Sequence, residues 1–309
     1  MIGRYRVLRP LGEGGMARVY AAEDTVVGRQ VAIKVLLPEW SQRADVATRF
    51  MNEAKAMGRI RHPGVVDVFE VMHAPSGDLC IIMEYVAGAT LREALWKQGP
   101  LPMPTALVVM EQLADTVAAA HAAHIIHRDL KPENIFLVPD PLDPARPRVR
   151  VLDFGVAKLE DSQARTATGT QLGTATYMAP EQFRNSKQVD HRADVYALGC
   201  VFFELVVGAP PLGGRNLFEQ MQAHLSQPPP LDRLPAETPP QVRALIARML
   251  EKDRERRLGS LAEAVALLRG GAATPSASAG PAGSRRAVVI ALLAIIAVAA
   301  GVAAAIALT

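Results

Sequence analysis

The first third of the chain alternates short apolar runs, rich in β-branched residues, with glycines and other turn residues. This pattern predicts β-strands over residues 5–11, 19–24, 30–36, 65–73 and 79–85. A helix is expected over residues 45–59, between the third and the fourth of these strands. The front of the chain is therefore expected to form a small β-rich unit with one long helix.

The pattern becomes helical after Gly88. Residues 105–123 and 194–207 are long apolar runs, typical of buried helices. Thr238 is expected to cap a further helix that starts with proline. Ser260 and Glu263 are expected to form the capping box of one more helix. A larger helical unit thus follows the β-rich one, and a cleft between two such units is a usual place for a ligand.

The end of the chain differs from the rest. Residues 287–308 form 22 consecutive positions without a charge, long enough at about 1.5 Å per residue to cross the hydrocarbon layer. A buried core helix is the alternative, but core helices are seldom apolar on every side. Arg285 and Arg286 precede this segment, so the positive-inside rule places the preceding residues in the cytoplasm. Residues 270–286, mainly Gly, Ala, Ser and Pro, are expected to be a flexible linker.

Composition narrows the classes of function. The 309 residues are 50% hydrophobic and 21% charged, which excludes a disordered tail protein. Two cysteines, Cys80 and Cys200, exclude a disulfide-rich scaffold and a multi-cysteine metal site. Without Arg285 and Arg286, the 34 basic residues become 32 against 31 acidic ones, so nucleic-acid binding is not expected. The positive mean hydropathy of +0.12 is attributed to the apolar end.

A glycine-rich turn, with the sequence LGEGGMARV over residues 11–19, joins the first two predicted strands. Glycines let backbone N–H groups approach phosphate oxygens, although most such turns are simple hairpins. A dinucleotide fold would need a helix directly after the glycines, and a strand is predicted there instead. Lys34 ends the next apolar strand and is either a solvated edge lysine or, if Glu53 steadies it, a cation for phosphates.

Three further motifs follow in order: His-Arg-Asp-Leu-Lys-Pro-Glu-Asn at 127–134, Asp-Phe-Gly at 153–155 and Ala-Pro-Glu at 179–181. As an ordered set with the glycine-rich turn and Lys34, they make residues 5–269 resemble the eukaryotic-like Ser/Thr protein kinases of bacteria. The resemblance implies an α+β fold with two lobes: a β-rich N-lobe over about 5–86 and a helical C-lobe over about 87–269. Residues 287–308 would add a transmembrane helix.

The resemblance assigns roles residue by residue. It implies that the glycine-rich turn covers the phosphates of ATP and that Lys34 contacts these phosphates and pairs with Glu53. It also implies that Asp129 orients the substrate hydroxyl and that Lys131 stabilises the transferred phosphoryl group. Asn134 and Asp153 would hold Mg²⁺, with Mn²⁺ as an alternative. The implied nucleotide-binding residues are Leu11, Gly12, Glu13, Gly14, Gly15, Val19, Ala32, Lys34, Glu53, Met83, Glu84, Val86 and Asp153.

Other residues are expected to support this site. Asp194 resembles the acid that braces the catalytic loop, which is the motif at residues 127–134, and Glu181 is expected to pair with Arg257. His127 and Phe154 are interpreted as packing residues and not as acid–base catalysts. The proline-rich stretch at 139–147 predicts a lengthened hairpin loop, of unknown function.

The motif variants favour Ser/Thr over Tyr as acceptor, and protein substrates are implied. Arg128 beside Asp129 suggests control by phosphorylation of the activation loop, with Thr166 and Thr168 as first candidates and Thr170 as third. Transient homodimers, favoured by crowding at the inner membrane, would support this trans-autophosphorylation. Two alternatives remain, a membrane-bound pseudokinase and a small-molecule phosphotransferase. The only weakened motif is the glycine-rich turn, where Ala17 stands at the third glycine position.

Overall fold

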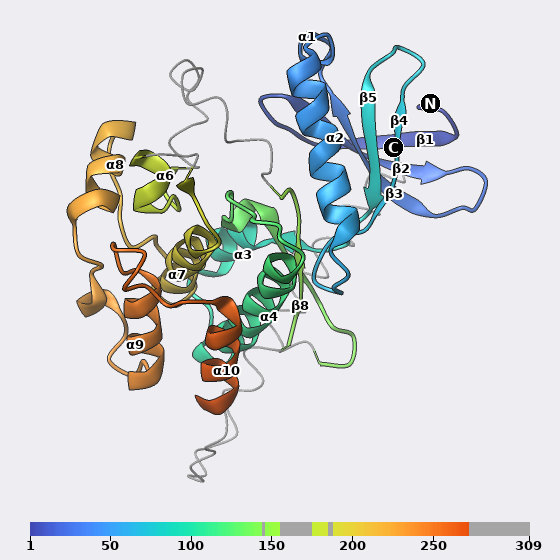
Figure 1. Cartoon of the computed structure of the whole chain (residues 1–309). Helices are drawn as coiled ribbons and strands as arrows, with labels where there is room; N and C mark the ends of the chain where they lie inside the picture. Colours follow the sequence, from blue (N-terminus) through green and yellow to red (C-terminus); the bar gives the residue numbers. More distant parts are fainter. Residues whose placement is uncertain (144–145, 155–174, 185–187, 272–309) are drawn as a thin grey trace.

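The computed structural model describes residues 1–143, 146–154, 175–184 and 188–271. A small lobe built on a sheet and a larger helical lobe lie side by side (Figure 1). The small lobe holds a five-stranded antiparallel sheet in the order β1-β2-β3-β5-β4. Its strands are β1 (Tyr5–Glu13), β2 (Ala17–Asp24), β3 (Gln30–Leu36), β4 (Val68–His73) and β5 (Leu79–Glu84).

Two helices, α1 (Pro38–Ser41) and α2 (Ala44–Arg59), complete the small lobe. The long helix α2 is amphipathic, and its apolar side lies against the sheet (Figure 1). Phe50 and Ala54 of α2 are buried in one cluster with Leu36 of β3 and Ile81 of β5. This packing fixes the face of α2 that carries Glu53.

The large lobe is mainly helical. Its helices are α3 (Leu91–Gln98), α4 (Met103–Ala122), α6 (Pro180–Arg184), α7 (Arg192–Val207), α8 (Leu217–Ser226), α9 (Pro240–Met249) and α10 (Leu261–Gly271), with 3-10 turns η1 (Pro132–Asn134) and η3 (Leu231–Arg233). A small sheet is formed by β6 (Ala89–Thr90), β7 (Ile135–Val138) and β8 (Arg148–Val151). Helix α7 is buried over nearly its whole length and forms the centre of the lobe. The expected two-lobed α+β fold is confirmed.

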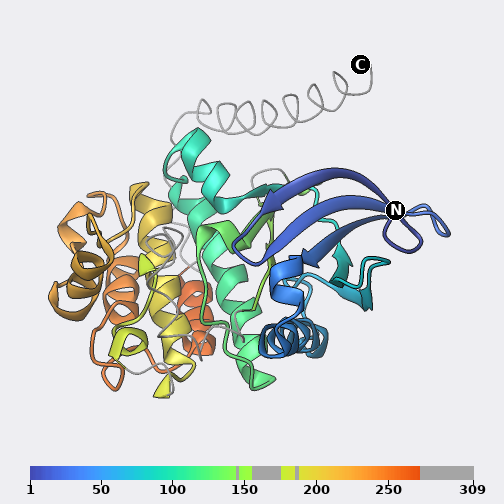
Figure 2. The same ribbon diagram turned by 90° about the horizontal axis from the view of Figure 1, so that it is seen from above.

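The two lobes are joined by main-chain hydrogen bonds as well as by the chain connection after β5. Val66 donates its N–H to the carbonyl of Val151 at 3.2 Å, and Val151 donates to Gly64 at 2.7 Å. Seen from above, the sheet of the small lobe lies beside the helices of the large lobe (Figure 2). The end of β8, which leads into Asp153, is therefore anchored to the small lobe.

The predicted helix caps have mixed outcomes. Ser260 caps α10, since its Oγ accepts the N–H of Glu263 at 3.2 Å. The prediction for Thr238 is wrong: α9 starts at Pro240 with Pro239 in the capping position, and the Thr238 hydroxyl is buried without a hydrogen-bond partner in the described part of the chain. The second proline lies at the first helical position, where no N–H is needed, and this moves the start by one residue.

Several expectations fall wholly or partly outside the described residues. The predicted membrane segment 287–308, Thr166, Thr168 and Thr170 all lie there, as do two positions of the proline-rich stretch. Within the described ranges, no helix has both the length and the apolar character needed to cross a membrane. The proline-rich stretch does connect the antiparallel strands β7 and β8, as the hairpin prediction required. Cys80 and Cys200 are both buried free thiols.

Candidate active site

The sheet register aligns the glycine-rich turn with Lys34. Gly12 of β1 pairs with Val19 of β2, and Val19 pairs with Lys34 of β3. The turn closes through a hydrogen bond from the Gly14 N–H to the carbonyl of Ala17 at 2.8 Å. A Cβ at Gly12 or Gly15 would meet no atom of the described chain within 4 Å, so the space over the turn is open. Both ends of the glycine-rich turn therefore share one row of the sheet with Lys34.

Lys34 lies between two carboxylates. Its Nζ is 2.7 Å from Oε1 of Glu53 on α2 and 2.8 Å from Oδ1 of Asp153. The predicted Lys34–Glu53 pair is thus present, and the carboxylate of the Asp-Phe-Gly motif joins it. Burial disfavours the charged ammonium, but the two carboxylates outweigh this and raise the pKa of Lys34. Burial raises the pKa of Glu53, whereas Lys34 lowers the pKa of Asp153 against the effect of burial.

An apolar surface adjoins this triad. Ala32 and Met83 are buried and paired across β3 and β5, and Val19 and Val86 pack against the same core cluster. Leu137 of β7, which the sequence motifs did not indicate, packs against it as well. The carboxylate of Glu84 is engaged by Arg150 and by the N–H of Asp67, so a ligand at this segment would meet the Glu84 backbone. Leu11 and Glu13 are exposed on the turn.

The catalytic-loop residues also come together. Asn134 donates from its amide nitrogen to the Asp129 carbonyl at 2.9 Å and to Asp129 Oδ2 at 3.2 Å. Lys131 Nζ lies 3.3 Å from the same carboxylate oxygen. The three side chains form one polar group, with Asp129 7% exposed and Asn134 9% exposed. The loop thus concentrates a carboxylate, an ammonium and an amide at a single point.

Two contacts join this group to the Lys34 triad. Leu152, directly before Asp153, donates its N–H to the carbonyl of Asn134 at 2.9 Å. His127 and Phe154 are fully buried, with ring centroids 4.6 Å apart, and His127 contacts the Leu152 carbonyl through Nε2 at 3.1 Å. Both residues pack, as predicted, and burial lowers the pKa of His127. The two polar groups are therefore held on one continuous framework.

The catalytic loop has a strained backbone that Asp194 holds in place. Arg128 has a φ of 65°, in the left-handed region that a bulky residue rarely adopts. Asp194, in the first turn of α7, accepts the backbone N–H groups of His127 and Arg128, both at 2.8 Å. His121 Nε2 lies 2.7 Å from Asp194 Oδ2. The predicted bracing of the loop by Asp194 is confirmed.

The Ala-Pro-Glu segment is tied to the large lobe by the predicted ion pair. Arg257 contacts both carboxylate oxygens of Glu181, at 2.6 and 3.0 Å. The Arg257 side chain is fully buried, so the pair is shielded from water. In addition, Gln182 donates to the carbonyl of Arg128 at 3.1 Å, which connects α6 with the catalytic loop.

Two polar clusters near the site were not found from the sequence. In the first, Arg92 of α3 contacts Glu133, Glu204 and the Tyr177 hydroxyl. The second joins buried residues of α7 and α8 with a half-buried residue that follows α9. Its members are Tyr196, Gln220, His224 and Lys252. The only local signal for the first cluster is a cation in the first turn of a helix, where the helix dipole disfavours positive charge.

The oxygen donors present suit the hard cation that the motif resemblance implies. Asn134 uses its amide nitrogen on Asp129, which leaves the amide oxygen as its other donor atom, and Asp153 is a charged carboxylate. Among the residues described, no group of three or more His, Cys, Asp or Glu side chains could hold a metal ion by itself.

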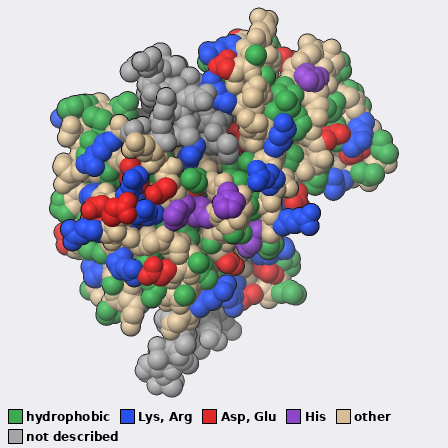
Figure 3. Space-filling model, viewed as in Figure 1, with side chains coloured by type: hydrophobic (Ala, Val, Ile, Leu, Met, Phe, Trp, Pro, Cys, Tyr) green, Lys and Arg blue, Asp and Glu red, His purple; other side chains and the backbone are tan. Residues whose placement is uncertain are grey.

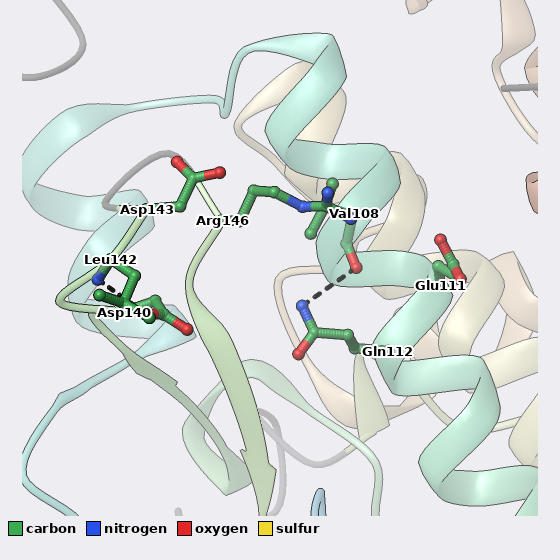
Figure 4. A pocket seen from close by; sticks show the side chains of 7 residues that line it. All are labelled: Val108, Glu111, Gln112, Asp140, Leu142, Asp143 and Arg146. Atoms are coloured by element: carbon green, nitrogen blue, oxygen red, sulfur yellow. Dashed lines mark hydrogen bonds between the residues drawn. The ribbon is translucent and has the colours of Figure 1, made fainter.

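Two hollows on the large lobe are lined by residues other than Lys34, Asp129 and Asn134. One, of about 350 Å³, lies between α4 and the proline-rich loop (Figure 4). There Gln112 holds the hairpin, donating to the Pro147 carbonyl at 2.9 Å and accepting the Val149 N–H at 3.0 Å. The other, of about 460 Å³, is lined by His121, His124 and His191 among others, and histidines gather on this face (Figure 3).

Comparison with known proteins agrees with this geometry. The family model described as "Protein kinase domain" matches residues 5–267. The serine/threonine-protein kinase pkn2 of Myxococcus xanthus is 42% identical over 278 residues, which cover 85% of this chain and 32% of the relative. PknA of Mycobacterium tuberculosis is 38% identical over 286 residues, which cover 90% of this chain and 64% of the relative. The chain thus spans from about a third to about two thirds of these relatives' length. It belongs to the protein kinase family, with bacterial serine/threonine kinases among its relatives.

Proposed function

We propose that the chain is an ATP- and Mg²⁺-dependent Ser/Thr protein kinase that transfers the γ-phosphoryl group of ATP to protein hydroxyls. The observation that carries this proposal is the pair of polar groups on one framework. Lys34 with Glu53 and Asp153 forms one, and Asp129 with Lys131 and Asn134 forms the other. Phosphoryl transfer needs positioning and charge neutralisation more than covalent help from the protein.

Each residue of the two polar groups has a separate role in phosphoryl transfer. Lys34 offers a fixed ammonium to the polyphosphate, and Glu53 keeps it in place. Asp129 orients the acceptor hydroxyl and takes up its proton, while Lys131 offsets charge on the transferred group. Asn134 and Asp153 would hold the magnesium ion, which neutralises phosphate charge when bound. The apolar surface around Ala32 and Met83 suits the adenine ring.

The decisive experiment compares wild type with Asp129→Asn in transfer of radiolabelled phosphate from ATP to a generic protein substrate. Loss of transfer in the variant, with nucleotide binding retained, supports the kinase. Equal labelling in both proteins would contradict the enzyme and favour the pseudokinase alternative. The presence of Lys34, Asp129, Asn134 and Asp153 argues against that alternative, because pseudokinases usually lose one of these groups.

Control by autophosphorylation at Thr166 and Thr168, with Thr170 third, is part of the proposal. Its support is Arg128, whose Nε is buried without a hydrogen-bond partner in the described part of the chain. An added phosphate brings about −1.5 to −2 charges, and an arginine held within the catalytic loop is a suitable partner for it. Phosphopeptide mapping after incubation with Mg-ATP tests this. Full activity of a Thr166→Ala/Thr168→Ala variant would contradict it.

The last part of the proposal is that the chain is attached to the inner membrane with its kinase domain in the cytoplasm. The support is the apolar segment 287–308 with Arg285 and Arg286 before it. Expressed in bacteria, the full chain should stay in the membrane pellet after alkaline extraction, whereas residues 1–271 alone should not. Cross-linking in these membranes tests the transient homodimer. Recovery of the full chain in the supernatant would contradict the attachment.

A further inference from the structure

Arg92 makes three polar contacts with groups from three other parts of the large lobe. Its Nε donates to Glu133 Oε1 at 2.8 Å, its Nη1 to Glu204 Oε1 at 2.6 Å, and its Nη2 to the Tyr177 hydroxyl at 2.5 Å. Tyr177 in turn donates to Glu204 Oε2 at 2.5 Å. Each nitrogen of the guanidinium group is therefore engaged.

The position of Arg92 on α3 is unfavourable for a cation. It lies in the first turn, where the partial positive charge of the helix end favours acids, and Glu93 of the Thr90 capping box occupies the next position. The capping box and the fully buried Leu91 fix this end of the helix. A residue that breaks a local preference and is rigidly held points to a role beyond helix stability.

The cluster runs from the interior to the surface. Glu204 is 1% exposed, and its two oxygens are taken by Arg92 and Tyr177. Glu133 is 44% exposed on its side chain and faces solvent. Two carboxylates share one guanidinium group, so the cluster carries one net negative charge with Arg92 and two without it. Arg92 therefore occupies an acidic site that opens to the surface at Glu133.

This acidic site adjoins the place of phosphoryl transfer. Glu133 belongs to η1 of the catalytic loop, between Lys131 and Asn134, and Tyr177 comes two residues before Ala179 of the Ala-Pro-Glu segment. A peptide that presents its hydroxyl to Asp129 would lie near Glu133, because the exposed Glu133 follows Asp129 by four residues on the same loop. A basic side chain of such a peptide would find Glu133 already paired.

We propose that Arg92 is a specificity-determining residue: as an internal cation, it fills the acidic subsite beside the catalytic loop and removes selection for basic residues near the phosphorylated hydroxyl. This rests on the proposed kinase function and names its substrate class, namely Ser/Thr peptides without a basic requirement at the position that meets Glu133. Substitution of Arg92 by a neutral residue opens the subsite to an arginine of the substrate.

A peptide library tests this, with Arg, Ala or Glu fixed in turn at each position around a central Ser/Thr. In the wild-type full chain, kcat/KM for Arg and Ala peptides should agree within about twofold at the position that meets Glu133, which is the position where Arg92→Gln changes the ratio. In Arg92→Gln, the Arg:Ala ratio should rise about tenfold at one or more positions, because a charge-assisted hydrogen bond to a carboxylate becomes available. Glu133→Gln added to Arg92→Gln should return the ratio to that of wild type.

Arg269→Gln, which breaks an exposed ion pair with Glu111, is the control and should leave the ratio unchanged. An unchanged ratio in a folded Arg92→Gln protein would overturn the proposal. If that variant does not fold, Glu133→Gln alone decides: an unchanged ratio supports the proposal, and a severalfold fall overturns it. If the wild type transfers phosphate to no peptide and no protein, the proposed kinase function itself fails, and the specificity proposal fails with it.

Discussion

The carboxylate of Asp194 holds the backbone of Arg128 through a 2.8 Å hydrogen bond, and it does so where the Arg128 φ of 65° is strained. The other carboxylate oxygen accepts the N–H of His127. A helix buried at the centre of the large lobe thus fixes the conformation of the loop that carries Asp129. A buried carboxylate is unusual without a charged partner, and here two N–H groups and His121 compensate its lost hydration.

Substitution Asp194→Asn should therefore reduce kcat by roughly 10²-fold, because an amide offers one acceptor where the loop needs two and a small displacement of Asp129 is costly. Unfolding in urea should show a loss of about 1–3 kcal/mol from the unsatisfied N–H. The exposed Asp232→Asn is the matched control and should change neither quantity. Normal turnover in Asp194→Asn would contradict the bracing role.

Lys34→Met should lower the rate of phosphate transfer by roughly 10²–10³-fold, because the ammonium facing the polyphosphate is lost. The variant also leaves Glu53 and Asp153 adjacent without their shared cation. Initial rates with radiolabelled ATP measure the effect. Lys55→Met, on the exposed side of the same helix as Glu53, should retain the wild-type rate.

The buried pair Glu181–Arg257 should contribute strongly to stability. Arg257→Met is expected to lower the free energy of unfolding by about 3–5 kcal/mol, because it leaves the Glu181 carboxylate without a charged partner in a site shielded from water. Breaking the exposed Arg215–Glu219 pair by Arg215→Ala should cost less than about 1 kcal/mol. Urea titrations of both variants give the comparison, and equal losses would be inconsistent with the buried geometry.

His224 should make the kinase domain sensitive to mild acid. Burial is the main cause that lowers the pKa of His224 from 6.5 to about 3. Between pH 3 and pH 6.5, His224 is protonated in the unfolded chain but not in the folded one. The stability that depends on neutral His224 is therefore complete above pH 6.5 and is lost as the pH falls toward 3. At pH 5 the loss is about 2 kcal/mol, at about 1.36 kcal/mol per pH unit.

Thermal or urea unfolding between pH 7 and pH 4 measures this slope in the wild type and in His224→Gln. The slope should be shallower in the variant, whose amide can still contact Tyr196. The exposed His73→Gln should leave the slope as it is. Identical slopes in His224→Gln and wild type would show that His224 does not cause the loss of stability in mild acid.

Much of this site was predictable because its information is local. Strand and helix periodicity predicted the five strands of the small lobe and the helices α2, α4 and α7 to within a few residues. The Lys34–Glu53 pair joins positions only 19 residues apart, on β3 and α2. The Arg92 cluster was not predictable, because its partners lie 41, 85 and 112 residues away and share no motif. The prediction for Thr238 was wrong for a different reason: two prolines in succession allow two helix starts, and α9 begins at the later one.

The two buried cysteines have a practical consequence. Burial raises the pKa of Cys80 to about 11 and that of Cys200 to about 12, so few thiolates form at neutral pH. Because the sequence contains no other cysteine, maleimide reagents should leave the native chain largely unlabelled. A single cysteine at the exposed Val26 of the small lobe or Trp96 of the large lobe would then carry a fluorophore selectively. Motion between the lobes can be followed in this way without first removing native thiols.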